Sequence, residues 1–152
     1  MVAVLAGRRA DAGPLTGDRG YMVRVSDCGP FIMRFPERNR KMSSRVEELL
    51  CEALPAIARE TGLVETRSID VYVVYGREDM VRLSGGSLPE WGEAFSDMRS
   101  GMMAIDASRV IRTPRPLRTV VAHELSHLVL AQKVAGARCP TWFVEGLAMR
   151  QS

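Results

Sequence analysis

The two histidines of this 152-residue chain stand four positions apart, as His123 and His127, in the run HELSH. Residues four apart lie on one face of an α-helix, so these imidazoles can bind the same metal ion. Glu124 follows the first histidine and projects close to the same point, where a carboxylate can act as general base on a metal-bound water. The run therefore requires a helix here, and it predicts a zinc site with hydrolytic chemistry.

The segment around this run predicts a helix that is buried on most sides. Pro114 and Pro116 stand at its start, where a proline fits the first turn, and Gly136 is expected near its end. Apolar residues surround the helix axis nearly completely: Val120, Val121, Leu125, Leu128, Val129 and Leu130. A helix of that composition is packed inside a protein. Burial favours a metal site, because it restricts water and fixes the rotamers of the ligands.

A third ligand is needed, because a catalytic zinc ion usually has three protein ligands and one open position for water. The chain has no third histidine, and its cysteines are poorly placed, so the third ligand is expected to be a carboxylate. Glu145 is the candidate, in the first turn of a helix that begins at Pro140 and Thr141. The alternative is a glutamate that only stabilises the N-terminus of its own helix through the helix dipole.

Together the two segments resemble a known group. The run HELSH followed by WFVEGLA at 142–148 is similar to the HExxH and WxxEGxA segments of gluzincin metallopeptidases, in the peptidase MA-like superfamily. The resemblance implies that His123, His127 and Glu145 bind zinc. It also implies that Glu124 takes a proton from the zinc-bound water and passes it to the leaving amine. The implied substrate is a peptide or a protein.

The resemblance extends upstream, so that residues from about 44 to 149 match in order. Residues 91–95 and 101–106 are similar to the segment that gluzincins place before the active-site helix. That segment implies a sheet edge beside the substrate cleft. The edge strand near 102–105 is expected to bind an extended peptide through backbone hydrogen bonds.

Two departures from the gluzincin pattern keep an alternative open. The family supplies a Tyr or His after the third ligand to stabilise the oxyanion, whereas here Arg150 is the only basic or aromatic residue after Glu145. Thermolysin-like members also have an Asp four residues after the glutamate, where this chain has Met149. The alternative is a catalytically silent zincin-like binding module, or a C-terminally shortened fragment of a larger peptidase that exposes an apolar face or forms a homodimer.

The remaining patterns predict an α+β fold, with a small mixed sheet beside the HExxH helix and a following helix that carries the third ligand. Residues 1–20 are expected to form a flexible leader, and 21–152 a single zincin-like domain. The other expected elements are a strand pair at 21–25 and 31–35, a helix opened by a capping box at 44–47 and ended by Gly62, a central strand at 69–75, an irregular connection over 77–100 and a strand at 101–106.

Composition weighs against several other classes of protein. The cationic residues behind the net charge of +3 are mostly arginines spread along the chain, so a nucleic-acid-associated protein is only a weak alternative. The chain shows no signal peptide and no run of about 18 apolar residues, so we expect no membrane span and a cytoplasmic location. Cys28, Cys51 and Cys139 are odd in number and lack CxxC spacing, which predicts reduced cysteines and no disulfide framework.

Overall fold

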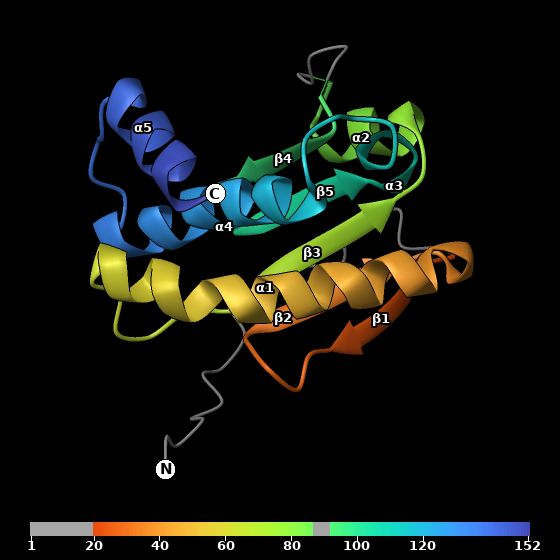
Figure 1. Ribbon diagram of the computed structural model, residues 1–152, viewed down its shortest axis with the longest axis horizontal. Coiled ribbons are helices and arrows are strands. Elements are labelled where there is room, and N and C mark those ends of the chain that lie inside the picture. The colour runs from red at the N-terminus through yellow and green to blue at the C-terminus, as the bar shows by residue number, and fades with distance from the viewer. Residues whose placement is uncertain (1–19, 87–91) are drawn as a thin grey trace.

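The computed structural model of the protein describes residues 20–86 and 92–152. These ranges form a mixed five-stranded sheet and five α-helices, which confirms the predicted α+β class (Figure 1). The leader predicted at 1–20 lies outside them, except for Gly20. None of the described helices combines the length and the apolar character that crossing a bilayer requires.

The sheet has the strand order β1-β2-β3-β5-β4. Its strands are β1 (Met22–Val25), β2 (Phe31–Phe35), β3 (Ile69–Val74), β4 (Ala94–Asp97) and β5 (Met102–Asp106). The predicted hairpin is confirmed, because β1 and β2 pair antiparallel. β2, β3 and β5 run parallel to one another, and β4 is antiparallel to β5. β3 is the predicted central strand.

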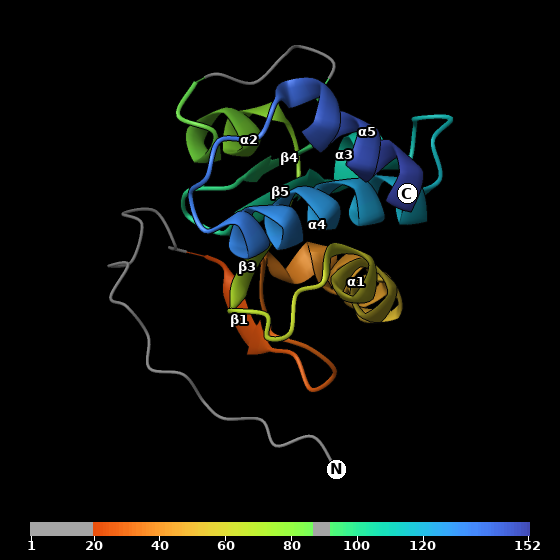
Figure 2. The same cartoon turned by 90° about the vertical axis from the view of Figure 1, so that its left-hand side faces the viewer.

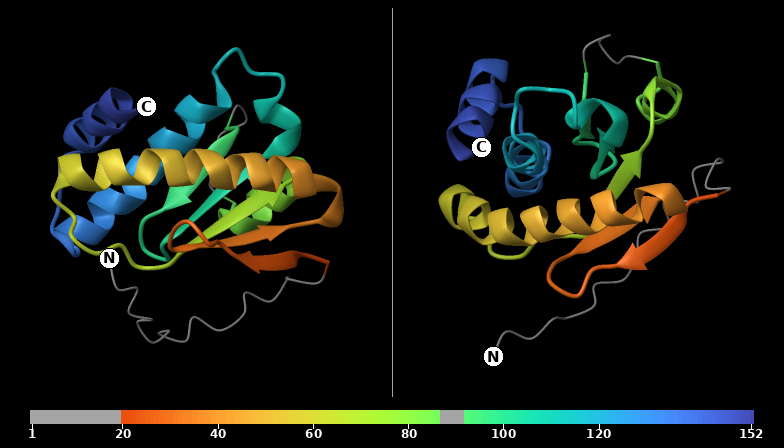
Figure 3. Two further views of the ribbon diagram at one scale, coloured as in Figure 1. Left: turned by 60° about the horizontal axis from the view of Figure 1, so that its bottom comes forward. Right: turned by 45° about the vertical axis from the view of Figure 1, so that its right-hand side comes forward.

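The helices lie on both faces of this sheet. They are the 3-10 turn η1 (Glu37–Asn39), α1 (Arg40–Thr61), α2 (Arg77–Leu83), α3 (Ala107–Val110), α4 (Leu117–Val134) and α5 (Thr141–Gln151). α1 and α4 lie side by side on one face, and α5 packs on the side of α4 that is turned away from α1 (Figures 2 and 3). The sheet, α1 and α5 thus enclose α4, which explains its apolar composition.

Side chains of the central strands alternate between two cores, one on each face of the sheet. Val71 and Ile105 belong to the larger core, which α1 and α4 cover. Tyr72 and Ala104 belong to a smaller core on the opposite face, where they pack with Met80 of α2. The sheet is therefore covered on both faces, and α4 is anchored on the larger core.

α1 begins earlier than the predicted capping box. It starts at Arg40, four residues before Ser44, and Gly62 ends it with a left-handed φ of 69°, as predicted. Ser44 and Glu47 do not cap the helix, because both side chains bind the guanidinium of Arg24 on β1. The capping-box prediction was wrong, since these two residues make a tertiary contact in place of a local one.

The irregular connection predicted over 77–100 contains two regular elements, so that prediction was wrong. α2 is anchored by the fully buried Met80, and β4 pairs with β5. Residues 87–91 lie outside the described ranges. β5 has β3 on one side and β4 on the other, so the sheet edge predicted near 102–105 is also wrong, and β4 is the edge. The four residues of β4 are too few to show a strand pattern, and only pairing with β5 defines them.

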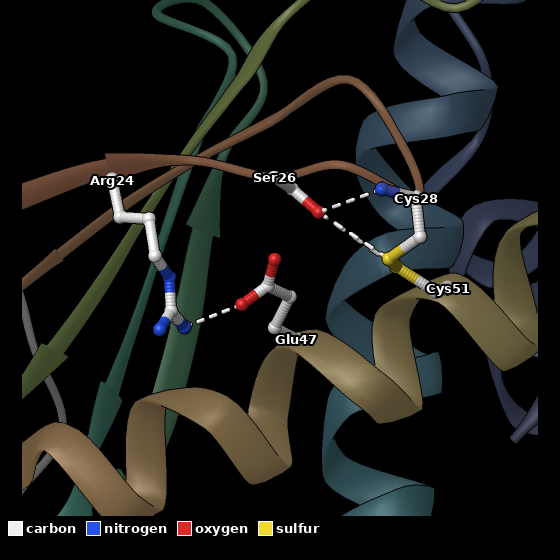
Figure 4. Close-up of a disulfide and its surroundings, with 5 residues drawn as sticks. All are labelled: Arg24, Ser26, Cys28, Glu47 and Cys51. Atoms are coloured by element: carbon white, nitrogen blue, oxygen red, sulfur yellow. Dashed lines mark hydrogen bonds and ion pairs between the residues drawn. A yellow bond between two sulfur atoms is a disulfide. The ribbon is translucent and has the colours of Figure 1, made fainter.

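Cys28 and Cys51 form a disulfide, which joins the turn between β1 and β2 to α1 (Figure 4). The prediction of three reduced cysteines is therefore wrong for this pair, and Cys139 alone is free. Counting and spacing could not find the bridge, because it joins two elements that meet only in the folded chain. Disulfides are rare in reducing compartments, so the cysteines no longer support a cytoplasmic location.

Replacing both Cys28 and Cys51 by serine is expected to lower the free energy of unfolding by about 3 kcal/mol, because the bridge restricts the unfolded chain over a loop of this length. The two cysteines are 23 positions apart in the sequence. Urea unfolding of the oxidised protein and of the double variant measures the difference. Cys139→Ser is the control and should leave stability nearly unchanged. A double variant as stable as the parent would show that the bridge adds nothing.

Candidate metal centre

α4 holds the two histidines against each other. The Nε2 atoms of His123 and His127 lie 3.2 Å apart, and the two ring planes are perpendicular. Leu125 and Leu128 of the same helix are buried in the larger core, which fixes α4 against the sheet. The prediction that this helix is buried on most sides is confirmed, and His127 itself is buried.

α5 brings Glu145 to the same point. Its Oε2 lies 3.6 Å from Nε2 of His123, and its Oε1 lies 3.7 Å from Nε2 of His127. The three ligand atoms lie within 4.8 Å of one another, so this group could hold one metal ion. The side chain of Glu145 is 52% exposed, so the group is open to solvent on the side of α5.

A turn after α4 and contacts at the last turn of α5 position this helix. At the end of α4, Ala135 and Gly136 have left-handed φ values of 47° and 89°, and the chain turns back there. At the other end, Ser126 Oγ donates a hydrogen bond to Oε1 of Gln151 at 2.6 Å. Nε2 of Gln151 in turn donates to Oε2 of Glu60 on α1 at 3.1 Å. These contacts orient the helix that carries Glu145.

The surroundings hold both imidazoles in the neutral form. Burial lowers the pKa of His123, and the charge of His127 lowers it further, against the opposing effect of Glu145. Burial also lowers the pKa of His127, and the Glu145 carboxylate opposes that effect. A neutral imidazole is the form that binds a metal ion, so the two rings are prepared as ligands.

Glu124 is directed toward β4. Ser96 Oγ donates a hydrogen bond to its Oε2 at 2.8 Å. Burial raises the pKa of Glu124 to about 7, the Ser96 hydrogen bond opposes the shift, and the charges of Glu145 and Glu93 add to it, while that of Arg115 lowers it. A carboxyl group that titrates near neutral pH can both accept and return a proton.

Ser96→Ala is expected to raise the pKa of Glu124 further, because the lost hydroxyl no longer stabilises the carboxylate form. Carboxyl ¹³C NMR titration of the metal-free protein measures this pKa. The control is Ser100→Ala, since Ser100 follows β4 and its hydroxyl bonds to Asp97. An unchanged or lowered pKa in Ser96→Ala would contradict the role given to the hydroxyl.

Three residues that the sequence did not single out border the site: Ser96, Glu93 and Arg115. Glu93 directly precedes β4, and its backbone carbonyl accepts a hydrogen bond from the N–H of Asp106 at 2.9 Å. Arg115 precedes α4, and its Nη1 lies 3.2 Å from Oε1 of Glu93. The resemblance placed residues 91–95 beside the substrate cleft, but it singled out none of these side chains, because they meet only where β4 lies against α4.

The end of α5 offers no obvious group for an oxyanion. Arg150, the only basic residue after Glu145, is directed to α1, where its Nη2 lies 3.7 Å from Oε2 of Glu60. Met149 is exposed, as are Trp142 and Phe143 at the start of the helix. The exposed apolar face and the homodimer expected from the sequence both stay predictions.

Comparison with known proteins assigns no family. No protein-family model, no curated protein and no solved structure matches the chain. The likeness to gluzincins therefore rests on the sequence segments alone.

Proposed function

We propose that this protein is a zinc-dependent peptidase with a zincin-like fold. The observation that carries the proposal is the convergence of His123, His127 and Glu145 from two helices, with Glu124 beside them. Three ligands with one open side suit catalysis better than a structural site, which is usually closed by four protein ligands. A half-buried carboxyl group with a raised pKa next to such a centre supports a role in proton transfer.

The donor set supports zinc as the ion. Two nitrogens bound at about 2.0–2.1 Å to a tetrahedral zinc ion lie about 3.3 Å apart. The Nε2 atoms of His123 and His127 are 3.2 Å apart, which matches that spacing. The oxygens of Glu145, at 3.6 and 3.7 Å from these nitrogens, need only a small movement to reach it. Imidazole ligands also argue against Mg²⁺ and Ca²⁺, which prefer oxygen ligands.

Each side chain of the site has its own role in the proposed hydrolysis. A zinc ion held here would supply a water that is acidic enough to ionise near neutral pH and would polarise the scissile carbonyl. Glu124 accepts a proton from the attacking water and gives it to the leaving nitrogen as the C–N bond breaks. Ser96 holds Oε2 of Glu124 and leaves Oε1 for the water. The exposed side of Glu145 leaves room for the substrate to approach.

β4 is the strand on which we place an extended peptide. It is the last strand of the sheet order, and in the described ranges no strand pairs with its outer side. Ser96 on β4 contacts Glu124, so this edge passes directly beside the site. A peptide added there is held by backbone hydrogen bonds, which are the same for any sequence. The strand proposed to bind the peptide is thus 94–97, in place of the strand near 102–105 expected from the sequence.

A second candidate is a zincin-like module that binds zinc and peptide without hydrolysis. The direction of Arg150 favours it, because that guanidinium contacts Glu60 on α1. α5 therefore supplies no Tyr, His or Arg beside Glu145 to stabilise an oxyanion. This candidate predicts metal and peptide binding with no turnover.

Metal content and hydrolysis, measured on one preparation, decide between the two. The proposal predicts one zinc ion per chain and cleavage of peptides from a digested protein mixture, which a chelator stops and added zinc restores. One zinc ion without cleavage would leave the binding module. A chain that binds no zinc would contradict both candidates.

A further inference from the structure

One ion pair borders the site and has no part in the mechanism above. Nη1 of Arg115 lies 3.2 Å from Oε1 of Glu93. The Glu93 side chain is only 14% exposed, whereas that of Arg115 is 52% exposed. The buried carboxylate therefore anchors one part of the guanidinium, while the rest faces solvent. An arginine has five N–H donors in a planar fork, so Arg115 keeps donors for a second carboxylate.

Arg115 lies on the Glu124 side of the site. Glu93 directly precedes β4, and Ser96 on the same strand bonds to Glu124. The Arg115–Glu93 ion pair therefore places the guanidinium beside the strand that contacts Glu124.

The part of a peptide substrate that follows the scissile bond, its leaving half, must lie on the Glu124 side of the site. Glu124 returns its proton to the leaving nitrogen, so the residues after the scissile bond pass close to its carboxyl group. Arg115 precedes the N-terminus of α4, and the helix dipole adds positive potential there. A divalent ion together with Arg115 balances the three carboxylates of Glu93, Glu124 and Glu145. An anionic group in the leaving half is therefore not repelled.

We propose that Arg115, anchored by Glu93, binds a carboxylate in the leaving half of the substrate. This inference rests on the proposed peptidase function and names its substrate class. The carboxylate is either the C-terminus of the peptide or the side chain of an Asp or Glu after the scissile bond. Both present the same two oxygens, which the guanidinium fork can bind with parallel hydrogen bonds.

Cleavage profiling tests the inference. Zinc-loaded protein is incubated with a proteome-derived peptide mixture, and the cleavage sites are read by mass spectrometry. Cleavage is expected to favour carboxylates after the scissile bond, and Arg115→Gln is expected to reduce that preference at least about tenfold. Arg112→Gln is the matched control, because it removes the same charge from the same loop. The inference would be overturned if Arg115→Gln kept the parent's preference for carboxylates after the scissile bond. It would also be overturned if Arg112→Gln lost as much of that preference as Arg115→Gln.

Two further arms identify the carboxylate and its anchor. Amidating the C-termini of the peptides removes the preference if Arg115 binds the terminus, and preserves it if Arg115 binds an acidic side chain. Glu93→Gln is expected to raise KM for the acidic peptides and not for neutral ones, because it loosens Arg115. Any change in kcat that follows from losing the Glu93 charge near Glu124 should be the same for both classes of peptide. A fall in kcat alone would contradict the anchoring role. Zinc content and the unfolding temperature of each variant exclude misfolding as the cause.

A binding arm separates the failure of this inference from the failure of the proposed function. Immobilised zinc-loaded Glu124→Gln protein is exposed to the same peptides, and the retained peptides are identified with and without Arg115→Gln. If the parent cleaves nothing, the peptidase proposal fails. The binding experiment still tests whether Arg115 binds carboxylates. Enrichment of acidic peptides that disappears with Arg115→Gln supports a carboxylate site. Equal retention by both proteins overturns it, since the zinc ion would then be the only group that binds carboxylates.

Discussion

Glu124→Gln is expected to lower kcat for peptide hydrolysis by about 10²–10⁴-fold, while the chain still binds one zinc ion. Glutamine keeps the size of the side chain and can still accept the hydrogen bond from Ser96, but it cannot take up a proton. Steady-state hydrolysis and metal content of the same sample measure both effects. Glu48→Gln is a matched control, because Glu48 pairs with Arg45 on the exposed face of α1.

The same variant has a second signature, which needs neither metal nor substrate. Burial raises the pKa of Glu124 from 4.5 to about 7, so the folded chain binds this proton more tightly than the unfolded chain does. Ionisation therefore costs stability, and the cost grows between these two pH values and is complete above the higher one. In the metal-free protein, Glu124→Gln is expected to stabilise the fold by about 3 kcal/mol at pH 8 and by very little at pH 4.

Urea unfolding at the two pH values measures that difference. Equal stability changes at pH 4 and pH 8 would contradict the raised pKa of Glu124. An unchanged kcat would remove Glu124 as the general base. Loss of zinc together with loss of kcat would show that the variant disrupts the centre, and the general-base assignment would lose its support.

The sequence was enough to place the three candidate ligands, because each depends on local rules. The four-residue step between His123 and His127 places both on one helix face, whatever surrounds the helix. Glu145 follows after a turn that glycine and proline mark, so α5 could be expected to return toward α4. The apolar composition of the α4 segment predicted that this helix is buried. These inferences needed no knowledge of the sheet.

The surroundings of Glu124 could not be predicted in the same way. Ser96 and Glu93 belong to the region of β4, whose four residues become a strand only by pairing with β5. Arg115 meets Glu93 because β4 lies beside α4 in the folded chain. Contacts between segments so far apart in sequence depend on topology, and a single sequence carries no direct signal of it. The disulfide between the hairpin turn and α1 escaped prediction for the same reason.

Replacing any one of the three ligands is expected to weaken zinc binding by more than about 100-fold, since even residues that only support a metal ligand contribute 10–100-fold. His127→Ala should have the largest effect, because His127 is buried and water cannot easily take its place. Glu145→Ala should have the smallest effect of the three, because its exposed position allows water to substitute. Competition with a chromophoric chelator measures the affinities.

Stability provides an independent readout of the same three variants. An ion that binds only the folded chain stabilises it in proportion to the logarithm of its concentration over the dissociation constant, by about 2.7 kcal/mol at a 100-fold excess over that constant. The parent and Met149→Ala, an exposed change on α5, should gain this stability when zinc is added. His127→Ala should gain almost none at the same concentration. If His127→Ala gains as much stability as the parent, the ion binds elsewhere in the protein. The proposed hydrolysis at Glu124 and the carboxylate site at Arg115 would then both be contradicted, because each depends on a metal ion at this centre.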